Sequence, residues 1–169
     1  NKVRMIFHPE TQKQLMYLKR ELDWRGKDID SFLTMVLMGA MHGQSSGFLS
    51  LSMPNTFSMS PNYVRKYIKK NDFRRPKRNV FTVLRKRCKR FLGRESLSGK
   101  GLSIHGDVRN LNRIEEIERN SVKMIFSSPP YLKVIKYGLY NWIRLWWLIG
   151  EHESIDNKLD DAHSIKPYL

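Results

Sequence analysis

The stretch SVKMIFSSPPYLKV, residues 121–134, runs from an apolar segment directly into a corner that contains two prolines. Residues 122–126 are mostly apolar, as in a buried strand, and turn-forming residues follow them at once. Proline lacks a backbone N–H and fixes its own φ, so Pro129 and Pro130 end the strand and keep the chain extended. The stretch therefore predicts a sheet strand that ends in a stiff corner with few backbone donors.

A second strand is expected upstream, in GLSIHGDV at residues 101–108, and a short helix at residues 112–119 separates the two strands. This order favours parallel neighbours in an α/β sheet, whose ligands bind beyond the carboxyl ends of the strands. Asp107 and Ser128 are then expected at the same edge of the sheet. As an alternative, Asp107 caps the helix that follows, which is the commoner role for an isolated aspartate in this position.

The corner after the second strand has the chemistry to hold a flat ring that carries an amino group. The backbone carbonyls around the prolines and the Ser128 hydroxyl accept hydrogen bonds from the amine, and the Tyr131 ring stacks on the flat face. A nucleobase taken out of a duplex fits this description. The alternative is a plain turn with an exposed tyrosine.

The chain upstream of residue 98 is predicted to be helical and strongly basic. Helices are expected from Pro9, after a cap at Asp28 or Asp30, after Ser60 and after Asn79, and an aromatic-rich helix is expected over residues 137–152. The net charge is +15, and residues 61–95 hold fourteen Lys or Arg against two acids. Such clustering indicates a polyanion partner, double-stranded DNA, rather than a surface that is basic only for solubility.

The basic surface splits into a part assigned to DNA and a part left open. The residues expected to contact DNA are Arg65, Lys66, Lys69, Lys70, Arg74, Arg75, Lys77 and Arg78. The basic face of the helix after Asn79 is either solvated or lies against phosphates, because a basic helix alone does not distinguish the two.

Several classes of protein are disfavoured by the composition. The single cysteine, Cys88, excludes an internal disulfide and a cysteine metal site, and the five histidines show no metal-ligand spacing. The apolar run at 139–149 is too short to span a bilayer and carries Arg144. A cytoplasmic protein without a membrane partner is therefore expected, and the start at Asn1 favours a piece of a longer protein.

The segments HGDVRNL (105–111) and SVKMIFSSPPY (121–131) together resemble the catalytic half of amino-methylating DNA methyltransferases, which carry a Ser/Asn/Asp-Pro-Pro-aromatic signature after a sheet strand. The segments HGQSSGFLSLSMPNTFSMSPNYVRKYI and YNWIRLWWLIGE also resemble sequences around that signature in one set of prokaryotic DNA methylases. The resemblance covers residues 5–169. It implies a partial Rossmann-like, S-adenosylmethionine-dependent methyltransferase sheet in residues 99–169, preceded by a basic helical recognition region in residues 1–98.

The resemblance also implies roles for individual residues. Ser128, Pro129, Pro130 and Tyr131 would hold an extruded base while a methyl group passes from S-adenosylmethionine to its exocyclic amine. Serine in the first position is more similar to the enzymes that methylate N4 of cytosine than to those that methylate N6 of adenine. Asp107 and Ser127 would contact the cofactor. The implied protein is a site-specific DNA methyltransferase of a restriction-modification or orphan system.

One feature of these enzymes is absent from the sequence: the glycine-rich turn of the Phe-x-Gly-x-Gly kind that approaches the cofactor. The nearest match, GQSSG at residues 43–47, lacks the helix that should follow it, because Pro54 intervenes. We expect the turn on a missing N-terminal segment or on a partner chain. Two alternatives stay open: a non-catalytic, basic nucleic-acid-binding protein with a vestigial methylase segment, and a methylase of RNA or of a protein glutamine.

Overall fold

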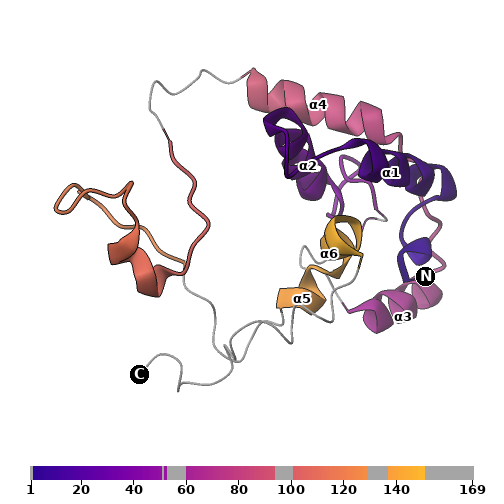
Figure 1. The fold of residues 1–169 in the computed structure, drawn as a ribbon. Helices are drawn as coiled ribbons and strands as arrows, with labels where there is room; N and C mark the ends of the chain where they lie inside the picture. Colours follow the sequence, from indigo (N-terminus) through magenta and orange to yellow (C-terminus); the bar gives the residue numbers. More distant parts are fainter. Residues whose placement is uncertain (1, 51, 53–59, 94–100, 129–136, 151–169) are drawn as a thin grey trace.

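The structure is a computed structural model that describes residues 2–50, 52, 60–93, 101–128 and 137–150. Its elements are, in chain order, η1 (Lys2–Met5), α1 (Pro9–Glu21), α2 (Asp28–Ala40), α3 (Pro61–Asn71), α4 (Val80–Leu92), η2 (Val108–Arg113), α5 (Tyr137–Tyr140) and α6 (Trp142–Ile149), where η denotes a 3₁₀ helix. The helices α1, α2, α3, α4 and α6 gather into one helical body, and the segment around η2 extends away from it (Figure 1).

Three helices begin where local capping chemistry predicts. The imidazole of His8 accepts a hydrogen bond from the Glu10 amide ahead of α1. Ser60 caps α3 through the amide of Tyr63, and Asn79 caps α4 through the amide of Thr82 at 2.9 Å. A side-chain acceptor at the first position satisfies an amide that the helix itself leaves unpaired.

The expected acidic cap of α2 is wrong. Lys27 occupies the cap position, and Asp28 is the first residue of the helix. Asp30 instead accepts a hydrogen bond from the Asp23 amide at 3.0 Å, which folds the turn between α1 and α2. The acids still lie in the first turn of α2, where the helix dipole favours negative charge.

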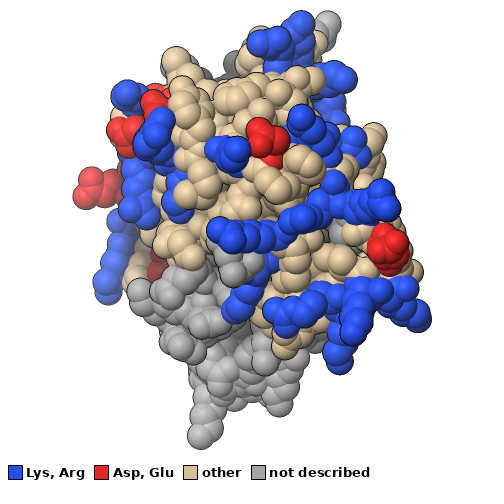
Figure 2. Space-filling view, turned by 90° about the vertical axis from the view of Figure 1, so that its right-hand side faces the viewer, with Lys and Arg blue, Asp and Glu red and all other residues tan. Residues whose placement is uncertain are grey.

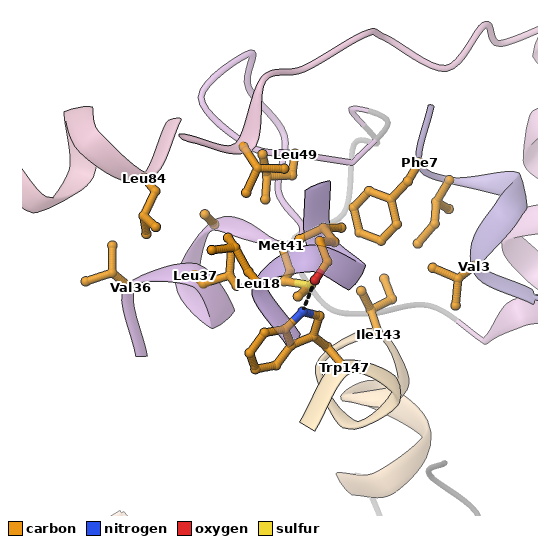
Figure 3. Packing of buried hydrophobic residues seen from close by; sticks show 14 of the residues in the cluster. Val3, Phe7, Leu18, Val36, Leu37, Met41, Leu49, Leu84, Ile143 and Trp147 are labelled. Atoms are coloured by element: carbon orange, nitrogen blue, oxygen red, sulfur yellow. Dashed lines mark hydrogen bonds between the residues drawn. The ribbon is translucent and has the colours of Figure 1, made fainter. Parts of the chain in front are cut away.

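The core lies between α1, α2, α4 and α6. Leu15 and Leu18 of α1 face Leu37 of α2 and Leu84 of α4, all of them buried. Figure 3 shows Leu18, Leu37 and Leu84 together with Ile143 and Trp147 of α6 and with Phe7 from the N-terminal segment. Because four separate stretches of chain share one apolar interior, the helices stabilise one another through burial rather than through intrinsic helix propensity.

The helix α6 is fastened to the first helices by hydrogen bonds to backbone carbonyls. The Trp147 indole N–H donates to the Leu15 carbonyl at 2.9 Å, and the Lys19 ammonium donates to the carbonyls of Trp146 and Trp147. Arg144 donates from Nε to the Met38 carbonyl at 3.1 Å. The tryptophans of α6 therefore help to fill a helical core.

The predicted α/β fold, with its partial Rossmann-like sheet in residues 99–169, is wrong: the described residues of this region contain no strand. Residues 101–107 and 121–128 have no regular secondary structure, and the predicted helix at 112–119 is replaced by η2, which ends at Arg113. Phe126 is 95% exposed and Met124 is 84% exposed.

The physical reason is a lack of covering layers. A parallel strand needs neighbours on its edges and helices on both of its faces, and two short segments supply neither. The apolar face of α6, which the sheet required as a cover, is already buried against α1. Residues 122–126 are mostly apolar, but among the described elements they have no strand to pair with and no helix to cover them.

Within the described residues, no helix combines the length and the apolar character that crossing a bilayer requires.

Candidate nucleic-acid interface

A cleft of about 800 Å³ opens beside α1. We call it the basic cleft, and its lining residues are Arg4, Pro9, Gln12, Lys13, Met16, Tyr17, Arg20 and Arg75. Four of these eight side chains are cationic. Lys13, Met16, Tyr17 and Arg20 lie on one face of α1 because they are spaced three, four and seven residues apart.

The connector between α3 and α4 closes the other side of the basic cleft. Arg75 donates a hydrogen bond from its guanidinium to the Arg4 carbonyl at 2.5 Å. Thr11 of α1 holds the connector in place, since its hydroxyl donates to the Arg78 carbonyl at 2.6 Å and accepts from the Arg78 amide at 3.1 Å. Two cations that are far apart in sequence thus meet at one cleft.

Two carboxylates moderate the charge of the basic cleft. Glu10 pairs with Lys13 at 3.0 Å, and this hydrogen bond lowers the pKa of the Glu10 carboxyl. Glu21 pairs with Arg20 at 2.8 Å. Both pairs are exposed, so water and salt screen them and they exchange readily for contacts with phosphate. The cleft keeps a positive excess even with both pairs formed.

Figure 2 looks onto the side of the molecule that carries α1, α3 and the N-terminus. Lysine and arginine side chains spread over much of this face, and few acidic side chains interrupt them. Such a concentration of one sign of charge creates a potential that attracts polyanions.

Aromatic side chains lie among these cations. Tyr17 separates the basic cleft from a smaller hollow of about 370 Å³, which is lined by Lys13, Gln14, Tyr17 and Phe81. The Tyr17 ring meets Phe81 edge-on at 6.2 Å between centroids, and the Arg20 guanidinium lies 5.4 Å from the Tyr17 centroid. Rings beside cations are the combination that proteins use to bind bases and phosphates together.

The eight residues predicted to contact DNA fall into four groups. Arg75 lines the basic cleft, and Lys66 and Lys70 line a groove of about 330 Å³ on α3. Four more are exposed around them: Arg65, Lys69, Arg74 and Lys77. Arg78 differs, because it is only half-exposed and its Nε is buried without a hydrogen-bond partner in the described structure.

Three other cations serve the fold rather than the surface. Arg87 donates to the Gly39 carbonyl at 3.2 Å and to the Gly47 carbonyl, while Lys19 and Arg144 bind carbonyls of neighbouring helices. Burial lowers the pKa of all three side chains. The net charge of the chain therefore overstates the charge available to a partner.

The proline corner, residues 127–131, is described only in part. Ser127 and Ser128 are exposed and belong to no helix or strand. Pro129, Pro130 and Tyr131 lie outside the described residues, so the predicted seat for a base stays a prediction. Ser127 and Ser128 line none of the three clefts described above.

Asp107 has the capping role that was the alternative to cofactor binding. Its carboxylate accepts from the Arg109 amide at 2.9 Å at the start of η2 and pairs with the Arg109 guanidinium at 2.5 Å. These hydrogen bonds hold the pKa of Asp107 at about 2. The prediction that Asp107 and Ser127 contact S-adenosylmethionine stays a prediction.

The sequence reasoning missed the contribution of the first helix. The residues predicted to contact DNA lie between positions 65 and 78, where cations are dense, and they do not include Arg4, Lys13 or Arg20. The signal was present in the spacing of Lys13, Tyr17 and Arg20 along one helical face. Charge density along the chain finds clusters, but only helical spacing shows which isolated cations share a surface.

Comparison with known proteins gives no assignment: no protein-family model, no curated protein and no solved structure matches this chain.

Proposed function

We propose that this chain binds duplex DNA through the basic cleft and is part of an amino-methylating DNA methyltransferase. In this enzyme, residues 128–131 would receive an extruded base. The methylated atom would be an exocyclic amine, N4 of cytosine in preference to N6 of adenine. The proposal joins two independent supports, which are the geometry of the cleft and the Ser-Pro-Pro-Tyr sequence of the corner.

The observation that carries DNA binding is the convergence of Arg4, Lys13, Arg20 and Arg75 on one open cleft. Lysine and arginine side chains form charge-assisted hydrogen bonds with the phosphates of the DNA backbone, and these contacts fix the position of the protein on the duplex. The α1 helix and the tethered connector both hold their cations on packed elements. Binding of this kind releases counterions from DNA, so its affinity falls steeply as salt increases.

The first experiment measures affinity for a fluorescein-labelled 20-base-pair duplex by fluorescence anisotropy at 50 and 200 mM salt. A variant with Arg4, Lys13, Arg20 and Arg75 replaced by alanine should bind at least about tenfold more weakly at 50 mM salt. Its dependence on salt should also become shallower, by about one unit of slope for each phosphate contact removed.

The matched control removes the same number of cations from α4. Arg85, Lys86, Lys89 and Arg90 are exposed, and none of them lines the basic cleft. Their replacement by alanine changes the net charge equally and should weaken binding far less. If the α4 variant loses as much affinity as the cleft variant, overall charge or α4 is responsible, and the cleft is not the DNA site. Thermal unfolding midpoints of both variants that equal the midpoint of the original chain exclude unfolding as the cause.

The second experiment tests methyl transfer. The protein encoded by the complete gene is assayed for transfer of a tritiated methyl group from S-adenosylmethionine to duplex DNA. We expect transfer, and we expect Ser128→Ala and Tyr131→Ala to reduce it while leaving duplex affinity within about twofold. Analysis of the digested DNA identifies the modified base.

A non-catalytic DNA-binding protein is the second candidate function. It is favoured by a specific observation: Asp107 is engaged by Arg109, and the described part of the corner is exposed. Duplex binding without methyl transfer by the complete gene product would support this candidate over the first.

A further inference from the structure

We infer that a column of three stacked rings, formed by Tyr63 and Tyr67 of α3 and by Phe73 just after it, is a stacking platform for unpaired bases of single-stranded DNA. The inference extends the proposed function, because it adds a second site on the same DNA-binding face and names a different substrate form. It rests on ring geometry, exposure and charge, each of which is described below.

The column is built by the helix and by the turn that ends it. Tyr63 and Tyr67 are one helical turn apart, with ring centroids at 6.1 Å and planes inclined by 18°. Asp72 adopts a left-handed conformation with φ of 45°, and the amide of Phe73 donates to the Ile68 carbonyl at 3.3 Å. This turn brings Phe73 onto Tyr67 at 5.5 Å and 17°.

The two outer rings of the column are exposed, although rings that only fill a core would be buried. Tyr67 is half-buried and packs against the core, but the two outer rings are not: Tyr63 is 44% exposed and Phe73 is 37% exposed. Three near-parallel rings present flat faces in one direction, and a planar base extends such a stack at an outer ring. The rings already touch one another, so the base does not enter between them.

The charge beside the column fits a polyanion rather than an apolar peptide. Lys66 and Lys70 lie with Tyr63, Tyr67 and Asn71 along a groove of about 330 Å³ on the same face of α3. A row of rings flanked by a row of cations can stack bases while it tracks the phosphates, which is the way that proteins bind single strands without reading sequence. Duplex DNA offers no free base faces along its length, so the ligand is unpaired DNA.

The platform continues into the basic cleft along the chain. Phe73 ends the column, and Arg75 lines the cleft two residues later. A strand that leaves the duplex at the cleft would meet the rings next. The arrangement suits DNA whose base pairing is locally opened, as extrusion of a base requires.

The test compares two labelled decamers of equal charge, an oligothymidylate and a strand of abasic residues, by fluorescence anisotropy with the full chain. Stacking contributes on the order of fivefold or more per base, so the oligothymidylate should bind at least about fivefold more tightly than the abasic strand. The double variant Tyr63→Leu, Phe73→Leu should bind both strands equally, at the affinity that the original chain has for the abasic strand. Tyr63→Phe should keep the preference.

Phe91→Leu is the matched control. Phe91 is 44% exposed, like Tyr63, and it also neighbours cations, but it lies near the end of α4 on the other side of the helical body from α3 (Figure 1). This variant should keep the preference for thymidylate. If the double leucine variant does not fold, 2-aminopurine in a single strand gives an independent readout, because its fluorescence should fall when the original chain binds it.

The outcomes separate this inference from the proposed function. Equal affinity of the original chain for the two decamers, an unchanged preference in the double variant, or no loss of 2-aminopurine fluorescence would each overturn the platform. The double variant should bind duplex DNA within about twofold of the original chain. If the original chain prefers thymidylate but the cleft variant keeps its duplex affinity, the platform stands and the cleft assignment fails.

Discussion

Trp147 shows how much of this fold depends on a single polar atom in an apolar interior. Its ring is buried, and its indole N–H is bonded to the Leu15 carbonyl at 2.9 Å (Figure 3). Trp147→Phe keeps most of the apolar contact but leaves that carbonyl without this donor, and an unpaired buried polar group costs about 1–3 kcal/mol. We expect the free energy of unfolding in urea to fall by that amount. Trp146→Phe, at a half-buried position, should cost less, and an equal loss would contradict this account.

His42 predicts how stability responds to acid. It is buried with its Nδ1 at 2.9 Å from the Ser50 hydroxyl, and burial, together with the nearby charge of Arg144, lowers its pKa below the ordinary value of 6.5. The unfolded chain therefore takes up a proton more readily than the folded chain does. The free energy of unfolding has its full value above pH 6.5 and falls as the pH drops below it.

The variant His42→Gln tests this effect. Urea unfolding at pH 7.5 and 5.5 should show a smaller loss of stability for His42→Gln than for the original chain, because glutamine does not titrate. His105→Gln, at an exposed position, serves as the control and should behave like the original chain. A variant at position 42 that loses as much stability in acid as the original chain would show that other groups dominate.

Residue-scale features were predictable where their partners are near in sequence. Ser60 and Asn79 were identified as caps because a cap and its amide are three residues apart. The half-burial of Arg78 was not predictable, since it depends on Thr11 in a different helix. The density of charge in the sequence predicted that Arg78 contacts DNA. It does not show which cations are partly buried within the fold.

At the scale of elements, Arg87 joins α4 to α2 and to the loop that follows α2. Its guanidinium bonds the carbonyls of Gly39 and Gly47 and lies 4.5 Å from the Phe48 centroid. Arg87→Met should lower the free energy of unfolding by about 1–3 kcal/mol, because it leaves these carbonyls without their charged donor. Arg85→Met removes the same charge from an exposed position and should change stability by less than about 0.5 kcal/mol. Urea unfolding of both variants decides, and similar losses would contradict the structural role of Arg87.

The helices were predictable to a degree that the strands were not. The starts of α1, α3 and α4 follow from capping residues and helical spacing, which are local. A strand is defined by its partners, so the apolar pattern of residues 122–126 predicted a strand without showing that any described segment pairs with it. The apolar end of α4 shows the same limit, since Leu92 is exposed although it is apolar.

At the scale of the whole molecule, the basic cleft combines cations from inside and outside the densely charged residues 61–95. The basic cleft takes Arg4 and Lys13 from the first elements and Arg75 from the connector, while Arg87 is withdrawn into the fold. A cationic surface was predictable from composition, because a charge of this size cannot be neutralised internally. Its position was not, because it depends on which helices pack side by side.

The whole chain also makes a prediction about S-adenosylmethionine. The methyltransferases that residues 105–131 resemble approach this cofactor with a glycine-rich backbone turn, and the sequence contains no turn of that kind. The described residues add no sheet edge to replace it, and the carboxylate of Asp107 is bound by Arg109. Isothermal titration of the 169-residue chain with S-adenosylmethionine should therefore give no micromolar binding. Titration of the same sample with duplex DNA, which the chain is proposed to bind, is the control. Micromolar affinity of the chain by itself would contradict this account.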